Sequence, residues 1–89
     1  MSIRRRVKVY GEVQGVFFRD STRREAERIN VSGWVQNCMD GSVEAVVEGE
    51  DYAVERMVGW LSEGPRRARI DHVVVEEEEP EGLSGFDVR

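Results

Sequence analysis

Hydrophobic and polar residues alternate along the N-terminal part of the chain. The apolar positions there are Val7, Val9 and Val13, and the positions between them include Lys8, Tyr10 and Glu12. Successive side chains of a strand point to opposite faces of a sheet, so Arg5 to Val13 is predicted to be a strand with one buried face. Gly11 and Gly15 interrupt the pattern, and glycines at such places mark a bulge, a positive φ or a close approach to the backbone.

Two later stretches have the three- and four-residue spacing of amphipathic helices. The first runs from about Phe18 to Asn30, with its apolar face at Phe18, Thr22, Ala26 and Ile29. Thr22 and Glu25 would form a capping box if this helix starts late, and Arg19 falls in the first turn in either case. The second helix has Asp51 as a candidate cap, and its apolar positions are Val54, Met57, Val58 and Leu61. Gly64 and Pro65 are expected to end it.

Between the two helices the sequence predicts a β-hairpin. The runs Val31–Asn37 and Ser42–Glu48 flank the pair Asp40-Gly41, and Asp-Gly between two strand-like runs is a strong turn signal. We expect the core face to hold Val43, Ala45 and Val47, and the water-facing side to hold Glu44 and Glu48. Asn37 lies just before the turn, where an asparagine most often bonds its own backbone and less often serves as an oriented catalytic amide.

Two further strands complete the predicted fold. Ala68–Glu77 is rich in β-branched residues but does not alternate strictly, which indicates either a bulge or burial on both faces. Gly85–Arg89 is predicted to be a short closing strand. The order β-α-β-β-α-β with an added C-terminal strand predicts an α+β, ferredoxin-like split βαβ fold, with two helices on one face of an antiparallel sheet. We expect residues 1–89 to form a single domain.

Composition narrows the possible functions. The net charge is −5, and a binder of polyanions usually needs a basic face, so we expect no nucleic-acid partner. No apolar run approaches the roughly 20 residues that span a bilayer, so we expect no membrane partner. The single cysteine, Cys38, cannot form an internal disulfide, and the start of the chain lacks the apolar core of a signal peptide. We expect a cytoplasmic monomer.

The candidate chemistry lies in the loop from Gly11 to Arg19, between the first strand and the first helix. The unpaired N–H groups at a helix N-terminus and the positive end of its dipole form an anion site. Arg19 adds a planar fork that matches a phosphate or carboxylate. Taken alone, Arg19 could also be a surface arginine paired with a nearby carboxylate. The expected ligand is a small, doubly charged oxyanion.

Other chemistries lack their required spacing. A Walker loop needs a lysine after its second glycine, and here Val16 follows Gly15. Cys38 has no arginine a few residues further on, so we interpret it as an ordinary thiol. His72 has no companion at metal-ligand spacing and is interpreted as a paired or half-exposed structural residue. The carboxylates are scattered, and none of their groupings is typical of a metal cage.

Two motifs are similar to the signatures of a known family. The stretch Gly11-x-Val13-Gln14-Gly15-Val16-x-Phe18-Arg19 resembles the first signature of the acylphosphatase family. The second signature of that family is similar to a later stretch of this chain, Gly33-Trp34-Val35-Gln36-Asn37-x-x-x-Gly41-x-Val43 followed by Gly49. The similarity covers nearly the whole domain.

The resemblance implies hydrolysis of acyl phosphates to a carboxylate and inorganic phosphate, without a metal or organic cofactor. It implies that Arg19 holds the phosphoryl group and that Asn37 positions the attacking water. The backbone amides that share the phosphoryl group would be those of Gln14, Gly15, Val16, Phe17 and Phe18. The implied partners are a small-molecule acyl phosphate and the phosphate product.

Two other functions remain as alternatives. A domain of this fold could sense acyl phosphates by binding them without turnover. It could also be an RNA-binding sheet, which would need aromatic and basic residues on its open face, where only Tyr10 and Trp34 are candidates.

Overall fold

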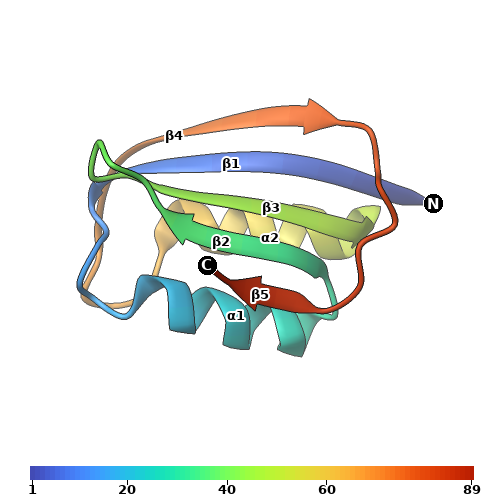
Figure 1. Ribbon diagram of the computed structural model, residues 1–89, viewed down its shortest axis with the longest axis horizontal. Coiled ribbons are helices and arrows are strands. Elements are labelled where there is room, and N and C mark those ends of the chain that lie inside the picture. The colour runs from blue at the N-terminus through green and yellow to red at the C-terminus, as the bar shows by residue number, and fades with distance from the viewer.

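The computed structural model describes residues 1–89. The elements follow in the order β1 (Ser2–Glu12), α1 (Phe18–Ile29), β2 (Ser32–Asn37), β3 (Val43–Glu50), α2 (Asp51–Glu63), β4 (Arg69–Glu78) and β5 (Phe86–Val88). The five strands form one sheet in the order β4-β1-β3-β2-β5 (Figure 1).

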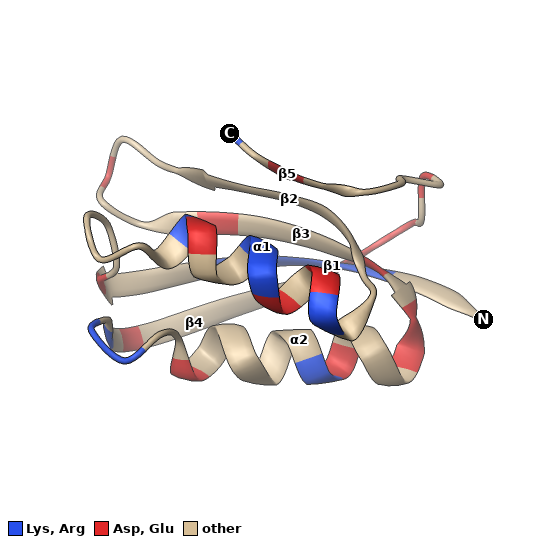
Figure 2. Ribbon diagram, turned by 90° about the horizontal axis from the view of Figure 1, so that it is seen from below, with Lys and Arg blue, Asp and Glu red and all other residues tan.

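Both helices pack on the same face of this sheet, and the core lies between the helices and the strands (Figures 1 and 2). α1 contacts β2 and β5, whereas α2 contacts β1, β3 and β4. The strand residues predicted to face the core are at most 1% exposed: Val7, Val9, Val13, Val43, Ala45 and Val47. The predicted fold class, with its two helices on one face, is confirmed.

The expectation of an antiparallel sheet is wrong for the last strand, which makes the sheet mixed. β5 pairs in parallel with β2, from Gly33 opposite Phe86 to Val35 opposite Val88, while the other three strand pairs are antiparallel. The connection from β4 to β5 turns back at one end of the sheet, so β5 runs opposite to β4 and in the same direction as β2 (Figure 1). This crossover places the end of the chain beside α1.

The first helix starts at about the residue that its apolar pattern predicts, but neither helix uses the side-chain cap that the sequence offered. α1 begins at Phe18, so the late start with a Thr22–Glu25 capping box is wrong, and the Thr22 hydroxyl instead donates to the Phe18 carbonyl at 2.7 Å. α2 begins at Asp51 itself, with Glu50 as its cap and no side-chain cap bond. Arg19 lies in the first turn of α1, as predicted.

The irregular pattern of β4 comes from a bulge. Tyr10 pairs with His72 and Gly11 pairs with Ile70, so Asp71 is an extra residue in β4. Gly11 has φ +139°, and a Cβ placed on it would lie 2.1 Å from the carbonyl oxygen of Arg69. The lack of a side chain at Gly11 therefore permits the close approach of β4. Of the two explanations that the sequence left open for the irregular pattern of this strand, a bulge or burial on both faces, the structure shows the bulge.

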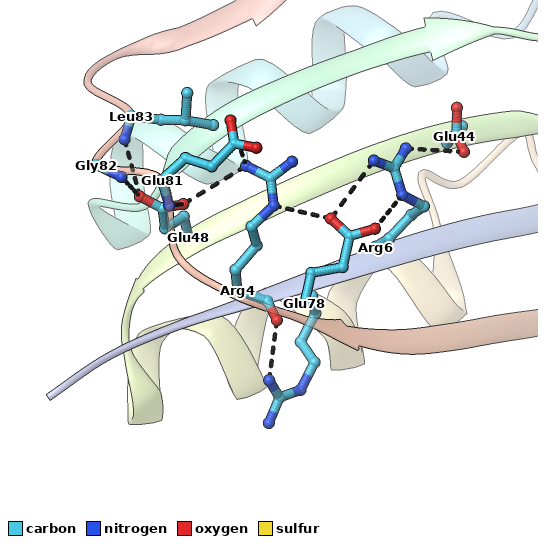
Figure 3. A network of polar contacts seen from close by, with 9 residues as sticks. Arg4, Arg6, Glu44, Glu48, Glu78, Glu81, Gly82 and Leu83 are labelled. Carbon is cyan, nitrogen blue, oxygen red and sulfur yellow. Dashed lines mark hydrogen bonds and ion pairs between the residues drawn. The ribbon is translucent and has the colours of Figure 1, made fainter.

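The prediction that Glu48 faces water is wrong. Glu48 is 4% exposed, and its carboxylate accepts main-chain N–H bonds from Glu81, Gly82 and Leu83, each at 2.8 Å (Figure 3). Arg4, also 4% exposed, lies beside it with Nη1 at 3.6 Å from the carboxylate. The connection between β4 and β5 folds over this part of the open face and buries it.

Burial alone raises the pKa of the Glu48 carboxyl. The three N–H bonds and Arg4 outweigh that effect, so the pKa of Glu48 is lowered from 4.5. The network continues through Glu78, which accepts from the Nε atoms of both Arg4 and Arg6 (Figure 3). It fastens the β4–β5 connection to the sheet and so fixes where β5 begins.

The outer surface of α1 carries charges of both signs (Figure 2). Asp20 pairs with Arg23 at 3.2 Å and with Arg24 at 3.1 Å, at the three- and four-residue spacing that brings helix side chains together. Neither helix has the length and apolar character needed to cross a membrane.

Candidate active site

A pocket of about 280 Å³ lies where the β1–α1 connection meets the end of β2 and the end of β5. These three segments come from distant parts of the sequence and gather at one end of the sheet (Figure 1). The pocket is lined by Val13, Gly15, Phe17, Phe18, Arg19, Asp20, Asn37 and Val88. Five of the seven residues predicted for the site are among them.

The connection from β1 to α1 bends through two left-handed residues. Gly15 has φ +75° and Phe17 has φ +60°, and Phe17 is the cap of α1. Glycine adopts such angles without steric cost, and no atom lies within 4 Å of where a Cβ of Gly15 would be. Phe18 next to it is 2% exposed and anchors the connection in the core.

The main-chain N–H groups of residues 14–19 donate no hydrogen bond within the chain. The first N–H groups of any helix lack intrahelical acceptors, and those of the preceding bend add to them here. The helix dipole places partial positive charge at the same point. This end of α1 is therefore suited to an anion.

Arg19 makes one hydrogen bond within the chain. Its Nη1 donates to the main-chain carbonyl of Arg89 at 2.6 Å, which joins the start of α1 to the end of the chain. The carboxylate nearest in sequence, Asp20, pairs with Arg23 and Arg24 instead. No Asp or Glu side chain pairs with Arg19, so the alternative of a surface arginine paired with a neighbouring acidic side chain is not what the structure contains.

The side chain of Gln14 makes contacts that the sequence did not indicate. Its side-chain amide donates to the carbonyls of Cys38 at 2.8 Å and Ser42 at 2.9 Å, at the two ends of the β2–β3 turn. Those two residues are also joined to each other by the N–H of Cys38, which donates to Ser42 at 2.8 Å. Gln14 therefore ties the β1–α1 connection to the hairpin that carries Asn37.

Asn37 is the last residue of β2, is exposed and lines the pocket. The turn after it spans residues 38–42, longer than the two-residue turn predicted at Asp40 and Gly41. The Ser42 hydroxyl and main-chain N–H donate to Asp40, and with Lys8 they lower the pKa of Asp40 from 3.8 to about 2. It is Asp40 rather than Asn37 that bonds the turn backbone, which leaves Asn37 facing the pocket.

The structure brings together Gly15, Phe17, Phe18, Arg19 and Asn37. Gln14 and Val16 are not among the lining residues, since the side chain of Gln14 bonds the hairpin and that of Val16 packs against the core, so only their main-chain N–H groups are left to face a ligand. Three lining residues were missed: Val13, Asp20 and Val88. Val13 and Asp20 flank the loop motif, whereas nothing in the sequence connects Val88 to it.

No cluster of three metal-ligating side chains occurs in the structure. His72 is exposed and stacks on Tyr10, with ring centroids 4.3 Å apart, and Cys38 is a free thiol. The polar groups that reach the pocket are a guanidinium, a carboxamide, the paired Asp20 and main-chain amides. This set can bind an oxyanion and orient a water molecule.

A family model described as Acylphosphatase matches residues 5–88. The chain belongs to the acylphosphatase family. An acylphosphatase of Rubrobacter xylanophilus is 60% identical over 88 residues, which cover 96% of this chain and 80% of that protein. One of Thermococcus kodakarensis is 52% identical, with 97% of this chain and 94% of that protein covered.

The fold agrees with solved structures of the same family. A structure of an acylphosphatase from Coxiella burnetii matches with a TM-score of 0.94 and 43% identity, over 99% of this chain and 93% of that one. This acylphosphatase chain is therefore an enzyme of the class that hydrolyses acyl phosphates.

Proposed function

We propose that the pocket hydrolyses acyl phosphates without a metal, with Arg19 and the loop amides binding the phosphoryl group and Asn37 orienting the water. The observation that carries this proposal is that Arg19 and Asn37 line one pocket with the N-terminus of α1. The substrate is a small acyl phosphate, and the products are a carboxylate and inorganic phosphate.

The phosphoryl group carries most of the charge of the substrate. The guanidinium of Arg19 donates two parallel hydrogen bonds to its oxygens, since its planar fork matches their spacing. The free N–H groups of residues 14–18, the predicted phosphate-binding amides, donate to the remaining oxygens, and the dipole of α1 adds to the attraction. These groups stay in place during the reaction, so they stabilise charge as it shifts in the transition state.

The chemical step is an in-line displacement at phosphorus. The water oxygen forms a new P–O bond while the bond between phosphorus and the acyl oxygen breaks, and that oxygen leaves with its electron pair as a carboxylate. The protons of the attacking water pass to the phosphate product and to solvent. A carboxylate is a weak base, with a pKa near that of Asp at about 3.9, and therefore leaves without a general acid.

Asn37 acts on the water. Its carboxamide oxygen accepts a hydrogen bond from the water and holds the water oxygen opposite the leaving group. An oriented polar group of this kind typically accounts for about 10² to 10³ in rate. Asp20 takes no part in this step because Arg23 and Arg24 occupy its carboxylate.

We also assign this activity to the monomer in the cytoplasm, with residues 1–89 as one catalytic domain. The groups that the proposed mechanism uses, Arg19, Asn37 and the loop amides, are all supplied by one copy of the chain. The lone free cysteine fits a reducing compartment. Sedimentation of the active protein at the mass of one chain would support the assignment of the activity to a monomer.

The proposal is tested with acetyl phosphate, with and without EDTA. Hydrolysis that survives the chelator, with phosphate as a competitive inhibitor, is the expected result. Phosphate binding without turnover would instead identify a sensing module. Activity that is lost with EDTA and restored by a divalent cation would overturn the metal-independent mechanism.

A further inference from the structure

Phe17 occupies a position that folding does not explain. It is 73% exposed, whereas Phe18 beside it is 2% exposed and belongs to the core. An aromatic side chain stabilises a fold when its apolar surface is buried away from water, whereas the ring of Phe17 stays largely exposed to solvent. The core therefore accounts for Phe18 and leaves Phe17 without a packing role.

The backbone at Phe17 is also unfavourable for its side chain. Its φ of 60° and ψ of 27° lie in the left-handed region, where a residue with a Cβ costs roughly 1 to 2 kcal/mol relative to the ordinary regions. The other non-glycine residue with positive φ is Asn30, which ends α1, and asparagine is common at that place. A bulky residue held in such a conformation is typical of a functional site.

Phe17 belongs to the lining of the pocket that holds the proposed catalytic groups. Phe17 lines the pocket together with Val88, which is 43% exposed, while Arg19 and Asn37 supply its polar groups. In an acyl phosphate a single oxygen joins the acyl carbon to phosphorus, so an acyl group stays close to whatever holds its phosphoryl group. The apolar residues of the same pocket are then the ones within its reach.

We propose that the exposed ring of Phe17, with Val88 of the same pocket, binds the acyl group and makes the site select aromatic over small aliphatic acyl phosphates. This inference rests on the proposed function, because it assumes that the phosphoryl group binds at Arg19. An aromatic acyl group stacks on the ring and removes apolar surface from water, and acetyl is too small to do so.

The test compares benzoyl phosphate with acetyl phosphate in the wild type and in Phe17→Gly. Both substrates carry the same phosphoryl group, so any damage to phosphoryl binding or water attack cancels in the ratio of their kcat/KM values. We expect the benzoyl-to-acetyl ratio to fall about tenfold, which corresponds to roughly 1.4 kcal/mol. Glycine suits the left-handed backbone, so the variant is expected to melt no lower than the wild type.

A second variant and a control exclude a general loosening of the loop. Phe17→Asn keeps a residue that tolerates left-handed angles and should lower the ratio as much as glycine does. Tyr52→Ala removes another exposed aromatic residue, 67% exposed on α2, and should leave the ratio unchanged. Inhibition constants of phenylphosphonate and methylphosphonate give the same comparison without turnover.

The outcomes separate this inference from the proposed function. A ratio within about twofold of wild type in both Phe17 variants, with hydrolysis retained, overturns the acyl contact and leaves the hydrolase standing. A wild-type protein that hydrolyses neither substrate overturns the proposed function and this inference with it.

Discussion

The guanidinium of Arg19 donates a 2.6 Å hydrogen bond to the main-chain carbonyl of Arg89. The two residues are 70 positions apart, and the bond joins the first turn of α1 to the end of β5. The placement of Arg19 therefore depends on β5, and through β5 on the connection that Glu48 holds.

The Glu48–Arg4 pair is expected to carry much of the stability of that connection. Glu48→Gln removes the charge that Arg4 faces and weakens the three N–H bonds from residues 81–83. Both side chains are 5% exposed, but Arg4 keeps its 2.9 Å bond to Glu78, so the loss comes mainly from the weakened N–H bonds and should be about 1 to 3 kcal/mol. Urea unfolding measures the loss.

The matched control is Glu12→Gln, which breaks a surface pair with Arg69 whose side chains are 69% and 70% exposed. A surface pair contributes little, so this variant should change the free energy of unfolding by at most about 0.5 kcal/mol. Equal losses of unfolding free energy in the two variants would show that the burial of Glu48 does not increase its contribution to stability.

Gln14 is expected to act as a positioning residue. Gln14→Met keeps the length of the side chain but removes both donors to the β2–β3 turn. The free energy of unfolding should fall by about 1 to 2 kcal/mol. The kcat/KM for acetyl phosphate should fall by about tenfold or more, since small displacements of reacting groups cost large factors in rate.

The control for Gln14 is Gln36→Met, since Gln36 bonds Glu44 and does not line the pocket. It should leave kcat/KM unchanged. A Gln14 variant that loses stability but keeps full activity would make this residue purely structural.

The pKa shift of Asp40 predicts a dependence of stability on pH. The folded state lowers the pKa of Asp40 from 3.8 to about 2, so the ionised form is favoured by folding. Its contribution is present above pH 3.8 and is lost as the pH falls toward 2. Asp40→Asn should therefore be less stable than wild type at pH 6, and the difference should shrink through this window.

Urea unfolding of both proteins between pH 2 and pH 6 measures that difference. Glu48 and Glu78, whose pKa values are also lowered, remain in both proteins and cancel in the comparison. A difference that stays constant across the range would show that the charge of Asp40 is not the cause.

The sequence predicted the elements and most of the core because those depend on local periodicity. It placed Val43, Ala45 and Val47 correctly, since their alternation reflects one buried face of a strand. It failed at Glu48 because the residues that bury this carboxylate lie more than 30 positions further along the chain. Such contacts leave no periodic signal beside the residue that they cover.

For the candidate site, too, the sequence predicted what depends on local motifs and missed what depends on distant contacts. The loop with Arg19 and the position of Asn37 follow from two local motifs, and the structure brings both to one pocket. The side-chain bonds of Gln14 and the presence of Val88 could not be read from the sequence, since they depend on how the hairpin and β5 meet the loop. The motif specified which residues belong to the loop but not which of their atoms face the ligand.

The central claim divides phosphoryl binding from water activation between Arg19 and Asn37. The direct measurement is the inhibition constant of phosphate, with kcat, in Arg19→Gln and Asn37→Ala. Arg19→Gln removes two charge-assisted hydrogen bonds worth about 3 to 6 kcal/mol, so the inhibition constant should rise more than about 100-fold and turnover should nearly vanish. Asn37→Ala should lower kcat by about 10² to 10³ and leave the inhibition constant within about threefold of wild type. Equal loss of phosphate affinity in the two variants would contradict this division.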